Sequence, residues 1–278
     1  MSTIGEYLTQ LFSLEGRIAL VTGGTGVLGG AIAHGLARAG AKIAILGRRE
    51  AVAQQVAAEI SAKGGEAMPL VADVLKREQL ELARQQVMDR WGRLDILINA
   101  AGGNHQSASV ALGSSFFALS EQGMQEIINL NLMGTILPSQ IFGEVMAQQR
   151  HGSIVNISSL SVPRALTRVI AYSAAKAGAE NFTRWLAINL AHAYGPALRV
   201  NAIAPGFFLA EQNRPFMVTE DGQYTARGQS VIAHTPAGRF GDPDELVGAA
   251  IWLCSPAASY VNGAVISVDG GFGAFSGV

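Results

Sequence analysis

Residues 18–39 of the chain read IALVTGGTGVLGGAIAHGLARA. The apolar run before the glycines predicts a buried strand, and the Ala-rich run after them predicts a helix. Between the two, Gly24, Gly26 and Gly29 form a GxGxxG pattern. Glycine lets the backbone approach a pyrophosphate closely, while the helix N-terminus directs unpaired N–H groups at it. The stretch therefore predicts a dinucleotide-binding turn rather than a glycine-rich turn that only packs a helix on a strand.

The same alternation of strand and helix continues along the chain. It predicts a parallel sheet, and runs that are apolar at successive positions predict helices on both faces. The expected fold is therefore a single-domain, Rossmann-type, doubly wound α/β domain spanning residues 1–278. We expect an amphipathic helical extension at 1–14 and a substrate lid at 207–240, a long region rich in Gln, Asn, Thr and Gly. About seven strands are predicted, at 17–22, 42–46, 67–72, 94–99, 153–158, 198–203 and 264–268.

Composition excludes several classes of protein. The 278 residues are 49% hydrophobic and carry 20 Lys and Arg against 21 Asp and Glu, which excludes disorder and offers no excess positive charge for nucleic acid or an acidic membrane. The apolar stretch 18–37 holds six glycines and is not expected to span a membrane. Glu6 and Glu15 interrupt any secretory signal. The single cysteine, Cys254, fits a reducing cytosol and is expected in the core, so the predicted location is cytoplasmic.

The end of the second predicted strand bears on the choice of cofactor. It reads Leu46-Gly47-Arg48-Arg49, at the place where an acidic residue would bind the ribose 2′-hydroxyl of NAD(H). No carboxylate stands there, and two guanidiniums could bind a 2′-phosphate. The sequence therefore favours NADP(H), with NAD(H) as the open alternative. Arg48 is the stronger candidate, because Arg49 could equally be a solvated surface side chain.

A second constellation is Tyr172-Ser173-Ala174-Ala175-Lys176, which places a phenol and an ammonium one turn apart on one helix face. A nearby cation favours phenolate, so we expect the Tyr172 pKa to fall from about 10 toward the working pH. Such a phenol suits proton exchange with a carbonyl or an alcohol. Ser159, at the carboxyl end of a predicted strand, could hold the substrate oxygen beside Tyr172, although a polar strand end is the commoner role of such a serine.

Together these motifs resemble the short-chain dehydrogenase/reductase family over nearly the whole chain. The resemblance implies that Asn131, Ser159, Tyr172 and Lys176 are catalytic, with Asn131 positioning Lys176 through an ordered water, and it also implies a homotetramer. The motifs that occur in family order are the glycine turn, Asp73-Val74, Asn99-Ala100-Ala101-Gly102, Asn131 in Asn131-Leu132-Met133-Gly134, Ser159, Tyr172 with Lys176, and Pro205-Gly206.

The resemblance also implies a cofactor-binding set. Two positions depart from the family pattern: Val27 stands where single-domain members usually have the middle glycine, and Ala210 where many relatives have a threonine that contacts the nicotinamide amide. The exact nicotinamide contacts are therefore left open. The predicted set is Gly23, Thr25, Gly26, Val27, Leu28, Arg48, Arg49, Asp73, Val74, Asn99, Ala100, Gly102, Tyr172, Lys176, Pro205, Gly206 and Phe208.

Within the family, four strings resemble the D-mannonate oxidoreductase, or fructuronate reductase, group, with gluconate 5-dehydrogenases as close neighbours. Arg168, between the catalytic serine and tyrosine, and Arg214, in the lid, could each clamp a sugar-acid carboxylate or be solvated. Asn104, His105, Gln212 and Asn213 could bond sugar hydroxyls or be ordinary loop polarity. The strings are residues 101–105 (AGGNH), 166–168 (LTR), 205–214 (PGFFLAEQNR) and the tail from Gly270 to Val278.

Three other interpretations stay open. Gluconate 5-dehydrogenase-like and 3-ketoacyl reductase-like activities use the same catalytic set. A redox sensor could bind NADP without turnover on the same fold, although the intact set of Asn131, Ser159, Tyr172 and Lys176 argues against it. Neither a metal site nor a serine hydrolase is indicated, because no HxH, HExxH or CxxC spacing occurs. The remaining histidines, His34, His151, His192 and His234, are scattered.

Overall fold

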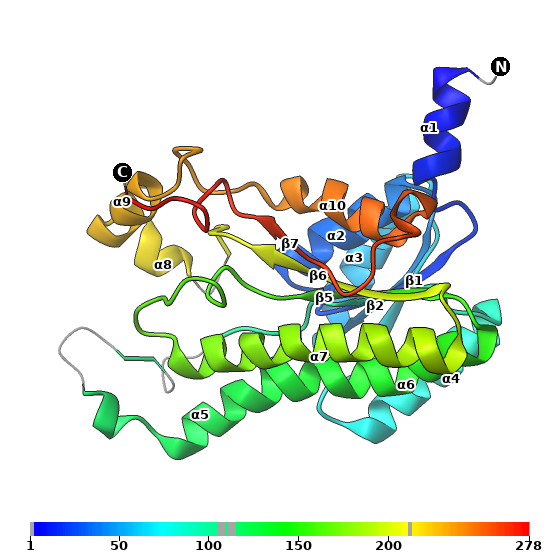
Figure 1. Cartoon of the computed structure of the whole chain (residues 1–278), viewed down its shortest axis with the longest axis horizontal. Helices are drawn as coiled ribbons and strands as arrows, with labels where there is room; N and C mark the ends of the chain where they lie inside the picture. Colours follow the sequence, from blue (N-terminus) through cyan, green and yellow to red (C-terminus); the bar gives the residue numbers. More distant parts are fainter. Residues whose placement is uncertain (1–2, 105–108, 111–114, 211–212, 278) are drawn as a thin grey trace.

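The centre of the molecule is one parallel sheet (Figure 1). The structure is a computed structural model, and it describes residues 3–104, 109–110, 115–210 and 213–277. Its strands are β1 (Ile18–Thr22), β2 (Lys42–Gly47), β3 (Ala67–Val71), β4 (Ile96–Asn99), β5 (Gly152–Ile157), β6 (Leu198–Pro205) and β7 (Val265–Val268). Within the described residues they form a seven-stranded sheet in the order β3-β2-β1-β4-β5-β6-β7. The predicted fold is confirmed, and each strand boundary lies within two residues of the predicted one.

Helices cover both faces of the sheet, as Figure 1 shows. One layer contains α2 (Val27–Arg38), α3 (Glu50–Ala62) and α10 (Val247–Cys254); the other contains α4 (Arg77–Trp91), α6 (Gly134–Gln149) and α7 (Ile170–Tyr194). The second layer also holds α5 (Glu121–Ile128), which continues into α6 through the π-helical turn η3 (Asn129–Met133). Short 3-10 turns are η2 (Phe116–Ala118), η4 (Pro243–Leu246) and η5 (Pro256–Ala258).

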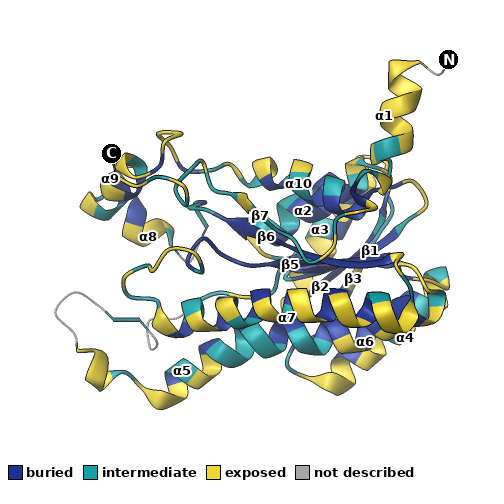
Figure 2. Cartoon of the chain, in the orientation of Figure 1, coloured by how far each residue is buried: buried dark blue, intermediate teal, exposed yellow. Residues whose placement is uncertain are grey.

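The apolar strands fill two cores because successive side chains of a strand point to opposite faces. In β1, Ala19 and Val21 belong to the apolar cluster that includes Leu36 of α2. Leu20 belongs to the other cluster, with Phe142 of α6. Figure 2 shows the central strands as a continuously buried part of the chain. Burial on both faces explains why β1 is apolar at successive positions, and Cys254 is buried in the first cluster as expected.

The N-terminal segment forms a helix that projects from the domain. This helix, α1 (Ile4–Phe12), has no buried residue, and its N-terminus is closed by a capping box between Thr3 and Glu6. Figure 2 shows it as exposed along its length. The helix lies inside the segment 1–14 for which the sequence predicts a helical extension. Among those residues, no helix has the length and apolar character needed to cross a membrane.

The segment 207–240 follows β6 and forms a small layer of its own beyond the sheet. Where the structure describes it, it contains α8 (Arg214–Met217) and α9 (Ala226–Ala233). Met217, Val218, Val231 and Phe240 form an apolar cluster separate from the two sheet cores. The segment therefore has an apolar cluster of its own, while Phe208 packs into the first sheet core.

Candidate active site

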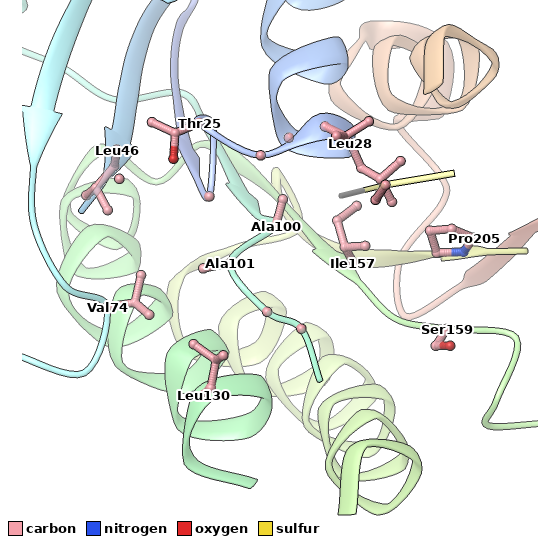
Figure 3. A pocket seen from close by; sticks show the side chains of 18 of the residues that line it. Thr25, Leu28, Leu46, Val74, Ala100, Ala101, Leu130, Ile157, Ser159 and Pro205 are labelled. Carbon is pink, nitrogen blue, oxygen red and sulfur yellow. The ribbon is translucent and has the colours of Figure 1, made fainter. Parts of the chain in front are cut away.

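A cavity of about 560 Å³ lies at the carboxyl ends of the strands. The pairing of Thr22 with Leu46 of β2 and with Asn99 of β4 brings three strand ends level. The chain leaves β1 toward one face and β4 toward the other, which opens a crevice between them. Figure 3 shows Thr25 and Leu46 at one end of this cavity and Ser159 and Pro205 at the other. The cavity is therefore long enough to bring the glycine turn and the predicted catalytic residues onto one wall.

The glycine turn is closely packed against the loop after β4. A Cβ on Gly23 would lie 2.7 Å from the Ala100 carbonyl oxygen, and Gly23 has a φ of +65°, a conformation that favours glycine. A Cβ on Gly29 would lie 2.3 Å from the Gly23 carbonyl oxygen. Thr22, which the sequence analysis did not single out, accepts bonds from the N–H groups of Ala100 and Ala101, each at 3.2 Å. These contacts fix the two loops that border the cavity.

The N-terminus of α2 faces this cavity without a side-chain cap. Its N-cap residue is Gly26, and no side chain bonds the first-turn N–H groups. Gly26, Val27 and Leu28 all line the cavity. Uncapped N–H groups and the helix dipole together attract an anion. This donor set fits the pyrophosphate of a nicotinamide cofactor, so the departure at Val27 leaves the cradle intact.

Arg48 and Arg49 both line the cavity at the end of β2. The Arg49 guanidinium donates to the Thr25 carbonyl at 2.7 Å, so Arg49 is held against the glycine turn rather than only solvated. Arg48 is exposed at the cavity edge. Asp73 and Val74, which follow β3, lie on the same wall. The residues expected around the adenosine end are therefore together in space.

Asn99 differs from its expected place. It is 1% exposed and is absent from the cavity wall. Its amide nitrogen donates to Ser139 at 2.9 Å and to Asn156 at 2.8 Å, so it ties β4 to α6 and β5 below the cavity. The Asn99 side chain thus points into the domain, and that Asn99 lines the cofactor stays a prediction. The other sixteen residues of the predicted set line the cavity; that they bind cofactor stays a prediction.

Ser159, Tyr172 and Lys176 meet on one wall of the cavity. Ser159 follows β5, and its Oγ accepts from the Ser161 N–H at 3.1 Å. Tyr172 and Lys176 lie in the first turns of α7. A side-chain hydrogen bond joins Ser159 to the Tyr172 phenol, and the Lys176 Nζ lies 5.7 Å from the centre of the Tyr172 ring. The structure thus brings together the serine, phenol and ammonium that the sequence separates.

Burial changes the expected protonation of these groups. It raises the pKa of Tyr172, and the hydrogen bond with Ser159 only partly opposes that rise. The prediction that Lys176 lowers the Tyr172 pKa is therefore wrong for this arrangement. The Lys176 Nζ donates to the Ile157 carbonyl at 2.6 Å, and burial lowers the pKa of Lys176 to about 8. At neutral pH Tyr172 is a neutral phenol, the form that can donate a proton.

Asn131 lies in the π-helical turn η3 and is fully buried. Its Oδ1 accepts from the Gly103 N–H at 3.1 Å, and its Nδ2 donates to the Gly103 carbonyl at 2.7 Å. A Cβ on Gly102 would lie 2.7 Å from Asn131 Oδ1 and 3.3 Å from Lys176 Nζ. Asn131, which is itself buried, therefore holds the loop after β4 in place, and Gly102 of this loop lies beside Lys176. Gly103, a residue that the sequence analysis gave no role, is its direct partner.

The predicted substrate residues are not all in one place. Asn213 lines the cavity, but its amide is engaged by the backbone of Phe208 and Ala210. Asn104 donates to Ser109 at 2.7 Å, away from the cavity wall. Arg214 is exposed at the start of α8. His105 and Gln212 lie outside the described residues.

The charge of Arg168 acts on a second guanidinium, Arg227, which the sequence analysis missed; neither residue is on the wall of the cavity that holds Tyr172. Burial lowers the pKa of Arg227 on α9, and the charge of Arg168 lowers it further. Arg168 has a φ of +77°, and its carbonyl accepts from the Val110 N–H at 2.9 Å. Two guanidiniums whose charges repel each other favour an anion between them. A survey of every arginine in segment 207–240 would have found Arg227, but only the fold brings it to Arg168.

The comparisons with known proteins agree with this geometry. A family model described as Enoyl-(Acyl carrier protein) reductase matches residues 25–273. The chain is 44% identical to the Bacillus subtilis protein named uncharacterized oxidoreductase UxuB, over 96% of this chain and 98% of that protein. The chain belongs to the short-chain dehydrogenase/reductase family. This family member is thus an oxidoreductase that acts on CH–OH groups.

Two solved structures resemble this short-chain dehydrogenase/reductase over nearly its whole length. One, from Haemophilus influenzae, is provisionally named a D-mannonate oxidoreductase and has NAD bound; it is 38% identical with a TM-score of 0.90, covering 98% of this chain and 100% of that chain. The other is a gluconate 5-dehydrogenase from Burkholderia cenocepacia in complex with NADP and tartrate, 34% identical with a TM-score of 0.85, covering 96% of this chain and 99% of that chain. A nicotinamide cofactor therefore serves this enzyme, and both forms occur among its neighbours.

Proposed function

We propose that this enzyme interconverts the ketone and the secondary alcohol of a sugar acid, of the fructuronate-to-mannonate type, with NADP(H) preferred. The observation that supports the substrate class is that Arg227 lies near enough to Arg168 for the charge of Arg168 to lower its pKa. Arg168 lies four residues before Tyr172 in the chain, and Arg227 lies near Arg168 from helix α9. A carboxylate between two guanidiniums would relieve their repulsion and orient the sugar.

The proton chemistry follows from the wall that holds Tyr172. When bound, the nicotinamide supplies the hydride for reduction or accepts it in oxidation. Tyr172, a neutral phenol at neutral pH, donates its proton to the ketone oxygen as the alcohol forms. Ser159 bonds the phenol and, from the same position, can hold the substrate oxygen at it. Lys176, whose Nζ is anchored on the Ile157 carbonyl at 2.6 Å, lies on the same wall and would hold the ribose of the nicotinamide.

The preference for NADP(H) rests on the charge at the end of β2. Arg48 and Arg49 line the cavity there, and Arg49 is anchored on the Thr25 carbonyl. A guanidinium that bonds a phosphate in a charge-assisted pair contributes about 1.5 to 3 kcal/mol. NAD(H) has no phosphate at this position. We therefore expect Arg48, whose side chain is exposed at the cavity edge, to bind the 2′-phosphate and so to favour NADP(H) over NAD(H).

A substrate panel tests the proposal. NADPH oxidation is followed by absorbance with fructuronate, 5-ketogluconate, a 3-oxoacyl thioester and an uncharged ketose, for the parent enzyme and for Tyr172→Phe. We expect turnover on the sugar acids, with a loss of about a hundredfold or more in Tyr172→Phe, the range for a positioned proton donor. A Tyr194→Phe control removes a phenol at the far end of α7 and should leave the rate unchanged. Turnover on the thioester but on neither sugar acid would contradict the proposed substrate class.

A gluconate 5-dehydrogenase-like activity is the second candidate. It is favoured by the likeness to the NADP-bound gluconate 5-dehydrogenase structure. Both candidates place the substrate carboxylate at the same arginine pair, and they differ in which keto-acid turns over faster. A redox sensor would bind NADPH and leave every member of the panel unreduced. The segment 207–240 as a substrate lid, a cytoplasmic location and a homotetramer are proposals that go with either activity.

A further inference from the structure

A second cavity, of about 220 Å³, lies at the opposite edge of the sheet. Arg17 precedes β1, Asp95 precedes β4 and Gly152 begins β5, so its walls come from the amino ends of the strands. The cavity with Tyr172 lies at the carboxyl ends. A strand of five or six residues separates the two by roughly 17 to 20 Å. Nothing in the chemistry of the active site uses this second cavity.

The wall of this cavity contains a buried cation without a counter-ion. Arg199 is 8% exposed, and no carboxylate in the described part of the chain forms an ion pair with it. Its guanidinium reaches only the carbonyls of Ser255 and Val261, at 3.4 and 3.5 Å. Burial raises the pKa of the adjacent Cys254 thiol to about 12, so no thiolate balances the charge. A buried unpaired cation is costly, and burial accordingly lowers the pKa of Arg199.

The other charges around the cavity are also mainly positive. Asp95 bonds Arg93 at 3.0 Å and the Ile18 N–H at 2.9 Å, and Arg17 lies 3.5 Å from it. Asp95 therefore already bonds two guanidiniums and a backbone N–H, and in the described part of the chain no ion pair joins it to Arg199. The pKa of His151 is lowered first by burial and then by Arg17, while Asp95 opposes the shift. The side chains of Arg17 and His151 are 32% and 46% exposed, which gives an ion a route from solvent.

We propose that this cavity binds a small oxyanion of the phosphate class between Arg17, His151 and Arg199. The anion would supply the counter-charge that Arg199 lacks. It would also accept hydrogen bonds from the Arg199 guanidinium, whose bonds to the Val261 and Ser255 carbonyls are long, at 3.5 and 3.4 Å. The volume of about 220 Å³ is below the roughly 300 to 1,000 Å³ of organic ligand sites. Either a free ion or the phosphate end of an ester has this chemistry. The site stands apart from the proposed sugar-acid activity.

Thermal unfolding of the enzyme tests the site. Saturating NADPH is present throughout, so that phosphate does not report through the cofactor cavity. We expect inorganic phosphate to raise Tm by roughly 4 °C over sodium chloride of equal ionic strength, because an ion that binds only the folded state stabilises it. Arg17→Gln should lose at least half of that rise, while Asp95 keeps Arg93 as its partner. The matched control Arg77→Gln, whose ion pair with Glu81 lies at the start of α4, should keep it.

A second measurement reports on the cavity itself. The ring resonances of His151 are followed by NMR during the same titration, and a bound anion should raise the His151 pKa by favouring the imidazolium. Glycerol phosphate is titrated in parallel: an equal response assigns the site to phosphate esters, and a response to phosphate alone assigns it to the free ion. A Tm rise no larger than that with chloride, equal rises in the parent and Arg17→Gln, or unmoved His151 resonances would each overturn the proposal.

Discussion

The phenol of Tyr172 has a raised pKa because it is buried, with only the hydrogen bond to Ser159 opposing the shift. Ketone reduction uses the neutral phenol, and alcohol oxidation uses the phenolate. We therefore expect kcat/KM for oxidation to rise with pH through the alkaline range and kcat/KM for reduction to fall over the same range. Initial rates in both directions across pH check this. An oxidation rate that does not change with alkaline pH would remove Tyr172 as the titrating group.

Lys176 gives a prediction for stability. Burial lowers its pKa from 10.5 to about 8 in the folded chain. Between those values the unfolded chain binds a proton that the folded chain does not, so the free energy of unfolding rises with pH. Relative to Lys176→Met, the parent without cofactor should gain up to about 3 kcal/mol between pH 8 and 10.5. Denaturant unfolding at a series of pH values measures the difference, and parallel curves for the two proteins would contradict it.

Arg48 provides the test of cofactor choice. Because its guanidinium is exposed at the cavity edge, Arg48→Ala should weaken NADPH binding by about 1.5 to 3 kcal/mol and leave NADH binding nearly unchanged. Dissociation constants for both cofactors measure this. The control is Arg38→Ala, an exposed arginine at the other end of α2. A preference for NADH in both the parent and Arg48→Ala would show that the 2′-phosphate has no site at Arg48.

At the level of elements, the connection before α7 and helix α9 approach each other through Arg168 and Arg227. Removing one charge from a repelling pair should raise Tm slightly in Arg168→Gln. The same change should lower kcat/KM on acidic substrates by roughly 2 to 4 kcal/mol and affect an uncharged ketose much less. Kinetics on fructuronate and the uncharged ketose decide this. Arg214→Ala is the comparison, and a selective loss there instead would move the carboxylate site to α8.

The sequence predicts what depends on neighbouring residues and not what depends on distant ones. The glycine turn and the spacing of Tyr172 and Lys176 are local patterns, so their elements could be predicted closely. Asn99 has the expected residue type at the expected strand end, but whether its side chain faces the cavity depends on packing against α6 and β5. The protonation of Tyr172 depends on burial by the whole fold. Arg227 becomes visible only when α9 is placed beside the β5–α7 connection.

For the molecule as a whole, the exposed face of α7 is where we expect the predicted homotetramer to assemble. Trp185 and Ile188 are 58% and 60% exposed and lie close together on this face. Large apolar side chains grouped on a surface commonly mark an interface. Trp185→Glu should therefore shift the enzyme to smaller species in sedimentation velocity, while Leu82→Glu, on exposed α4, should not. An unchanged sedimentation profile for Trp185→Glu would place the contacts elsewhere.

The separate apolar cluster of segment 207–240 has a consequence for how the molecule opens. Met217, Val231 and Phe240 pack with one another and not with the two sheet cores. A unit with its own interior can detach at a free-energy cost well below that of global unfolding. Amide hydrogens in α9 should then exchange with solvent deuterium by local opening, whereas those of β1 and β5 exchange only when the whole domain unfolds. Ligands could thus enter and leave the active site at the rate of this local opening, with the sheet intact throughout.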